Sequence, residues 1–185
     1  MTDDTEFEVD DAIVLLLGSE STSGERRGEI RGITRLEKLV LLFESETEAS
    51  KYMTEDADFD AYNFGPFSKK VYQAVDTLAA AGLINDSSQL SSSADDTWEE
   101  EKLIGTEAGL TSFATRNFSL TPLGIEYYSA LAAELPAEVA ASASALRVRF
   151  AGWPLRALVR YVYEKYESFA EKSLIRDEIL GKKRT

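Results

Sequence analysis

The sequence contains neither cysteine nor histidine. Without cysteine the chain can form no disulfide bond and offers no thiolate nucleophile. Without histidine it lacks the imidazole of serine-histidine triads and the commonest nitrogen ligand of metal sites. These two absences exclude several classes of enzyme, together with the zinc sites that are built from cysteine and histidine.

Long apolar segments are also missing. The longest apolar runs, residues 12–17 and 39–43, are far shorter than the ~20 residues that cross a bilayer as a helix, so we expect no membrane span. The first residues include Asp3, Asp4, Glu6 and Glu8, which is the opposite of the basic start of a secretory signal. We therefore expect a cytoplasmic protein.

Acidic residues outnumber basic ones by 33 to 20, which gives a formal net charge of −13. With 185 residues and 44% hydrophobic residues, the chain can bury the core of one globular domain. The acid-rich, lysine-poor composition suggests a halophilic protein, in which carboxylates keep the surface hydrated. Positive charge is clustered in residues 26–38 and 143–185, so the total charge alone does not exclude nucleic acid as a partner.

Apolar spacing predicts three helices in the first half of the chain, over about residues 10–18, 34–46 and 68–82. Thr34 and Glu37 have the spacing of a capping box at the start of the second helix. Ser68 is placed to cap the third helix, and Gly82 to end it. The segments between them, residues 18–32 and 47–63, are expected to be a flexible basic connector and an irregular acidic stretch.

The second half begins with a Ser- and acid-rich segment, residues 85–111, which we interpret as a long, mobile hairpin loop. Residues 115–120 alternate as a strand does, and Thr121-Pro122 is typical of a helix start. That helix is expected to use Leu123, Tyr127 and Leu131 as its inward face until Pro136. Two further helices are predicted on either side of Trp153-Pro154. Their inward residues are Val139, Ala143, Leu146 and Phe150 in one, and Leu155, Leu158, Val159, Val162 and Tyr166 in the other.

This order of helices and strands predicts an α+β, mostly α fold: a winged helix-turn-helix core with a two-stranded wing and a C-terminal helical extension. The winged-helix domain would span residues 1–135, with the long acidic wing loop at 85–111. The extension would span residues 136–185 and would serve for dimerisation or for a partner.

Four stretches carry a resemblance to a known family: GITRLEKL at 32–39, FGPFS at 64–68, LTPLG at 120–124 and YVYEKY at 161–166. Together they resemble the YwgA-like uncharacterised proteins and, more distantly, the SocA-like antitoxin (Panacea) domain, which shares a Leu-x-Lys-Leu helix followed by a Gly-Pro turn. The chain has Glu167 where relatives tend to continue with proline. The resemblance implies a non-catalytic module associated with regulation, toxin neutralisation or defence against mobile elements.

The third predicted helix occupies the position of a recognition helix. A phosphate at its N-terminus would pair with lysines and with free backbone N–H groups, and Gln73 could reach a base edge. The alternatives are that the lysines are simply solvated and that the basic residues at 26–38 pair with the acidic N-terminus. The candidate DNA-binding residues are Arg31, Arg35, Lys38, Ser68, Lys69, Lys70 and Gln73.

A second group combines arginine with aromatic residues, the composition of interface hot spots. Its alternative interpretation is that aromatic residues such as Trp153 and Tyr163 pack the C-terminal helices against the core. The candidate partner-binding residues are Gly65, Pro66, Phe67, Arg156, Arg160 and Tyr163.

No motif indicates catalysis, a metal or a cofactor. Asp56-x-Asp58-x-Asp60 resembles the start of a calcium loop, but Ala61 stands where the loop needs glycine and Phe67 where it needs glutamate. We therefore expect no enzyme, no metal and no cofactor. The leading function is a winged-helix transcriptional regulator that binds double-stranded DNA as a homodimer, linked to a defence or toxin-antitoxin system. The alternative is a protein-binding module, antitoxin-like or part of a defence complex, that does not bind DNA. The clustered basic residues and the order of the elements favour the first function, and the net charge favours the second.

Overall fold

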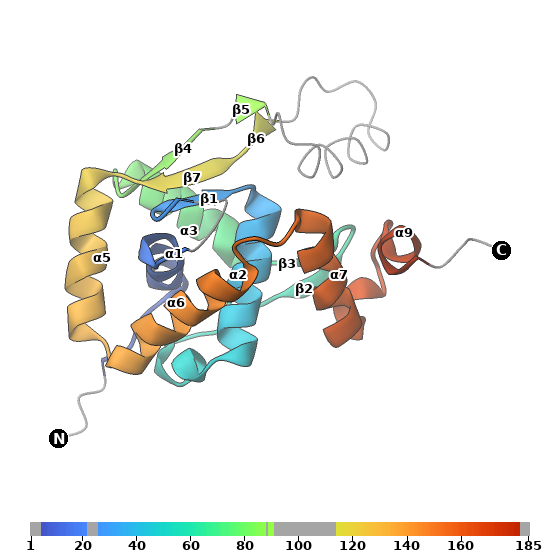
Figure 1. Ribbon diagram of the computed structural model, residues 1–185, viewed down its shortest axis with the longest axis horizontal. Coiled ribbons are helices and arrows are strands. Elements are labelled where there is room, and N and C mark those ends of the chain that lie inside the picture. Colours follow the sequence, from blue (N-terminus) through green and yellow to red (C-terminus); the bar gives the residue numbers. More distant parts are fainter. Residues whose placement is uncertain (1–4, 22–25, 88, 91–113, 182–185) are drawn as a thin grey trace.

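Helix α1 (Val9–Gly18) lies at the centre of the fold, between α2, α3, α5 and α6 (Figure 1). The computed structural model describes residues 5–21, 26–87, 89–90 and 114–181. From Ala12 to Leu17, every side chain of α1 has 0% exposure. A helix that is apolar all round is stable only when neighbours cover it on every side, and this is the position that α1 takes.

Helix α2 (Ile33–Glu46) packs on α1 and starts two residues earlier than the capping-box pattern predicts. Gly32, with a φ of 87°, is its N-cap, so Thr34 lies inside the first turn and the predicted box is wrong. The physical reason is that Glu37 is buried and accepts a hydrogen bond from the backbone N–H of Ser68 at 3.0 Å. Its carboxylate is therefore committed to holding α2 against α3.

A three-stranded antiparallel sheet, in the order β1-β7-β4, covers one side of the helices (Figure 1). Ile30 pairs with Phe118, and Ile84 with Leu120, which places apolar residues on the face toward the core. The strand expected over residues 115–120 is present as two short strands, and the supposed flexible connector contributes β1. Most of the predicted wing loop lies outside the described residues. The strands are β1 (Glu29–Arg31), β4 (Ile84–Asp86), β5 (Gln89–Leu90), β6 (Ala114–Thr115) and β7 (Asn117–Leu120).

The stretch expected to be irregular contains a short 3-10 helix, η1 (Glu48–Tyr52), and strand β2 (Asp60–Tyr62). Strand β2 pairs with β3 (Gly65–Phe67), and Asp60 lies directly across from Phe67. Helix α3 (Lys69–Ala80) follows at once. The predicted cap is confirmed, because the Ser68 side chain accepts a hydrogen bond from the N–H of Val71.

Helix α5 (Pro122–Glu134) starts as predicted, with the Thr121 side chain accepting from the N–H of Gly124. Its expected inward face is wrong for Leu123 and Tyr127, which are exposed, whereas Leu131 is partly buried against the core. The buried position is Gly124, where a Cβ atom would come within 2.0 Å of the Leu83 carbonyl oxygen. This close approach turns the helix so that Leu123 and Tyr127 face outward.

The last third of the chain forms four helices that join the same hydrophobic core as α1, α2 and α3. All the predicted inward residues of the two long helices are buried except Tyr166, which is half-buried. Within the described residues, no helix is both long and apolar enough to cross a membrane. The four helices are α6 (Ala137–Phe150), α7 (Leu155–Lys165), α8 (Glu167–Ala170) and α9 (Arg176–Leu180).

Candidate partner-binding surface

Two of the residues expected to contact DNA are in the interior. Lys38 is 1% exposed, and its ammonium group donates to the Pro66 carbonyl oxygen at 2.9 Å. Ser68 is fully buried, with its hydroxyl engaged in capping α3. Neither side chain can reach a phosphate, so these two assignments are corrected. The burial of the Lys38 charge is offset by this hydrogen bond and by Glu37, whose carboxylate lies 4.0 Å away.

The lysines at the start of α3 differ in their surroundings. Lys69 and Gln73 are exposed on the helix. Lys70 forms ion pairs with Glu55 at 2.8 Å and Asp58 at 2.6 Å, and these hydrogen bonds raise its pKa. The segment between η1 and β2 therefore places two carboxylates beside Lys70 at the N-terminus of α3. The exposed acidic residues of this segment and of the first position of β2 are Glu55, Asp56, Asp58 and Asp60.

The three candidate DNA-binding residues between 31 and 38 do not form one phosphate-binding surface. Arg31 is exposed on β1, whereas Arg35 donates to the Trp153 carbonyl oxygen at 3.0 Å. Lys38, the third of them, lies in the core. Arg35 connects α2 to the loop between α6 and α7, which is a role within the fold.

Three of the stretches that carry the family resemblance meet at the Gly-Pro turn. Gly65 has a φ of 95°, and a Cβ there would come within 2.4 Å of the Tyr163 ring. Lys38 binds the Pro66 carbonyl from the other side. Gly65, Pro66 and Tyr163 are all buried, so they cannot contact a partner, and the core interpretation of Tyr163 is correct. Of the three turn residues, only Phe67 is partly exposed.

The two arginines expected to bind a partner from α7 are exposed and already have contacts within the chain. Arg160 pairs with Glu164 at 2.8 Å, and Arg156 donates to the Glu178 carbonyl oxygen at 2.9 Å. Exposed pairs of this kind hold little free energy, about 0.2–1 kcal/mol, so they do not prevent a partner from competing for these arginines.

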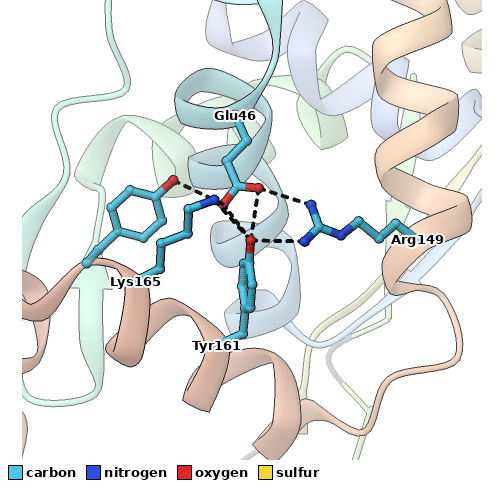
Figure 2. Close-up of polar contacts among 5 residues, drawn as sticks. Glu46, Arg149, Tyr161 and Lys165 are labelled. Carbon is cyan, nitrogen blue, oxygen red and sulfur yellow. Dashed lines mark hydrogen bonds and ion pairs between the residues drawn. The ribbon is translucent and has the colours of Figure 1, made fainter.

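A charged cluster that the sequence did not indicate fixes α7 to the end of α2 (Figure 2). Glu46, whose side chain is 9% exposed, accepts from Lys165 at 2.7 Å and from Arg149 at 3.2 Å. The hydroxyl groups of Tyr161 and Tyr166 donate to the same carboxylate at 3.0 and 3.1 Å. Burial by itself would raise the pKa of Glu46, but these hydrogen bonds outweigh it and lower the pKa.

This arrangement is unsuited to acid-base chemistry. A general base needs a pKa near the working pH and a free lone pair facing the substrate, whereas the Glu46 carboxylate has a lowered pKa and four donors around it. The cluster therefore has a structural role: it holds α7 against the end of α2. We call Glu46 and its four donors the Glu46 clasp. The signal in the sequence was the run YVYEKY, which supplies Tyr161, Lys165 and Tyr166, but nothing in the spacing pointed to Glu46.

Three aromatic side chains from consecutive elements form a surface that we call the aromatic row: Tyr62 on β2, Phe67 on β3 and Tyr72 on α3. The Phe67 ring centroid lies 5.2 Å from that of Tyr62 and 5.2 Å from that of Tyr72. Tyr62 is 54% exposed. Sequence reasoning found Phe67 but missed both neighbours, because β2 was taken as irregular and Tyr72 was not on the predicted outward face.

Among the described residues, no group of three or more acidic side chains is arranged to hold a metal ion. Comparisons with protein-family models, with curated proteins and with solved structures found no match to this chain.

Proposed function

We propose that this protein is a non-catalytic protein-binding module whose partner contacts the aromatic row. The observation that carries the proposal is the exposure of Tyr62, 54%, at the end of a packed line of three rings. Large aromatic side chains held rigidly by neighbours are the residues that dominate binding energy at protein interfaces. The resemblance to antitoxin-like domains agrees with a partner of this class.

The charge around α3 argues for protein over DNA. Affinity for DNA comes mainly from lysines and arginines that neutralise phosphates. Of the seven expected DNA-binding residues, Lys38 and Ser68 are buried and Lys70 is paired with two carboxylates. The exposed acidic residues beside the N-terminus of α3 would repel a phosphate at the point where a recognition helix receives one.

The arrangement of the elements favours a second candidate, a winged-helix transcriptional regulator that binds double-stranded DNA as a homodimer. In that interpretation α3 is the recognition helix, and β4 and β7 are the arms of the wing. Lys69 and Gln73 are exposed on α3, as this function would require. The helices after Pro136 would then supply the dimer interface.

Photo-crosslinking in the native cell tests the first candidate. A photoreactive phenylalanine analogue at position 62 should form discrete protein adducts that are absent when it stands at Val148, an exposed apolar residue on α6. Adducts identical at both positions, or none at 62, would contradict the proposal.

A mobility assay with random duplex DNA over a range of salt concentrations tests the second candidate. We expect no retardation even at low salt, in the wild type and in Lys69→Glu alike. Retardation that Lys69→Glu abolishes would replace the protein-binding proposal with the regulator.

A further inference from the structure

One end of the aromatic row already holds an arginine of this chain. The Arg116 guanidinium lies 5.9 Å from the Tyr72 ring centroid and 5.7 Å from that of Phe118. Two carboxylates fix it there: Asp86 at 2.6 Å and Asp76 at 2.8 Å. A cation over an aromatic face is attracted by the ring quadrupole, and flanking carboxylates add ion pairs that orient the planar guanidinium.

The other end of the row repeats these chemical elements. Asp60 and Tyr62 are two residues apart on β2, so their side chains leave the same face of the strand. Asp60 also lies directly across from Phe67, which packs on Tyr62. A carboxylate and two rings therefore share one face, of which Asp60 and Tyr62 are exposed and Phe67 is partly exposed. In the part of the chain that the structure describes, no lysine or arginine forms an ion pair with Asp60 or lies over the Tyr62 ring.

We infer that this end binds an arginine side chain of the partner protein, with its guanidinium over the Tyr62 ring and paired with Asp60. The inference rests on the proposed function and specifies its partner: a segment that carries an exposed arginine. Arg116 on Tyr72 shows within the same row how such a group is held.

Charge complementarity extends beyond the one contact. Asp58 and Glu55 precede Asp60 in the sequence and share Lys70 at the start of α3, and the chain has a net charge of −13. A basic segment would thus be attracted before contact. The same field disfavours a nucleic acid at this surface.

Arginine is preferred to lysine for a geometric reason. The guanidinium is planar and can stack on a ring while it donates two parallel hydrogen bonds to a carboxylate. The lysine ammonium is a strongly hydrated point charge and cannot do both in one plane. Lysine should therefore bind this surface more weakly.

The test is an NMR titration of the full chain at low salt with the peptide acetyl-Gly-Leu-Arg-Leu-Arg-Leu-Gly-amide. We expect saturable shifts at the amides of Asp60, Tyr62 and Phe67. The same peptide with citrulline, which keeps the shape but lacks the charge, should cause no shifts there, and the lysine version should bind more weakly.

Variants of the chain separate a specific contact from general attraction. Tyr62→Leu keeps apolar area without the aromatic face and should weaken the arginine peptide ~2–5-fold, and Asp60→Asn should weaken it by a similar factor. Glu134→Gln, which removes one exposed charge at the end of α5, should bind like the wild type.

Equal binding of the arginine and citrulline peptides, shifts that map elsewhere, or equal weakening in all three variants would overturn the inference. The protein-binding proposal would survive each of these results if the photo-crosslinked adduct at position 62 is still formed. The absence of that adduct would contradict the protein-binding proposal, whatever the titration shows.

Discussion

Two glutamates in the last turns of α2 show how the position of a carboxylate decides whether its pKa is raised or lowered. Glu44 accepts one backbone hydrogen bond, from Ala57 at 3.1 Å, and burial raises its pKa above the ordinary 4.5. Glu46, two residues later, faces Lys165 and Arg149, and its pKa is lowered. Sequence alone could not distinguish them, because the groups that donate to these two carboxylates lie 13 to 120 positions away in the chain.

Glu46→Gln is expected to lower the free energy of unfolding at pH 7 by about 2 kcal/mol, since charge-assisted hydrogen bonds to a largely buried carboxylate are lost. A carboxylate with a lowered folded pKa stabilises above its unfolded pKa, and this contribution disappears as pH falls through the folded value. The difference in the free energy of unfolding between the wild type and the variant should therefore become smaller below pH 4.5. Urea denaturation at several pH values measures this difference.

Glu44→Gln is the matched control for that experiment. Its amide oxygen can still accept from Ala57, and ionised Glu44 is disfavoured by burial, so we expect stability at pH 7 to be unchanged or up to ~1 kcal/mol higher. Equal destabilisation by both substitutions would contradict a specific stabilising role for the hydrogen bonds to Glu46.

Gly65→Ala tests the junction of the Gly-Pro turn with Tyr163. The substitution forces an L side chain into a positive φ, which costs ~1–2 kcal/mol, and places a Cβ against the buried Tyr163 ring, which adds ~1–3 kcal/mol. Gly28 has a similar φ of 86°, with no atom within 4 Å of the added Cβ. The Gly28→Ala variant should therefore lose only the ~1–2 kcal/mol that comes from the positive φ. Similar melting temperatures for the two variants would contradict the packing argument.

At the scale of elements, signals that act within one turn of helix predicted the structure well. Ser68 and Thr121 cap the helices that follow them, and apolar spacing located α1, α2, α3, α6 and α7. The failures concern features that depend on distant partners. Strands β1 and β2 are three residues long, too short for an alternation pattern, and exist because β7 and β3 pair with them.

Dependence on distant partners also explains why the candidate site could not be predicted in full from the sequence. A lysine in a helix is usually exposed, so the sequence predicts Lys38 at the surface, but the Pro66 carbonyl that accepts its hydrogen bond is 28 residues away. Several residues of the stretches that carry the family resemblance pack on one another, as Gly65 does on Tyr163. Tyr62 belongs to no motif, and Asp60 belongs only to the incomplete calcium-loop pattern, since a partner-binding surface needs only rings and charges brought to one place by the fold.

At the scale of the molecule, the charge is unevenly distributed between interior and surface. Basic residues such as Lys38, Arg147 and Lys70 are buried or paired, which leaves many carboxylates unopposed on the surface. Such a surface repels itself, and the repulsion is stronger in the compact state than in the unfolded chain. The hydrophobic core around α1 must outweigh this repulsion.

Added salt should therefore stabilise the protein. The Debye length falls from ~30 Å at 0.01 M to ~10 Å at 0.1 M and ~3 Å at 1 M, so we expect the melting temperature to rise with potassium chloride, most steeply below ~0.1 M. The melting temperature of the Glu46→Gln variant should rise with salt by the same slope, because the carboxylate of the Glu46 clasp is largely buried and salt screens it little. A melting temperature that falls as salt is added would mean that ion pairs stabilise this surface more than its excess negative charge destabilises it.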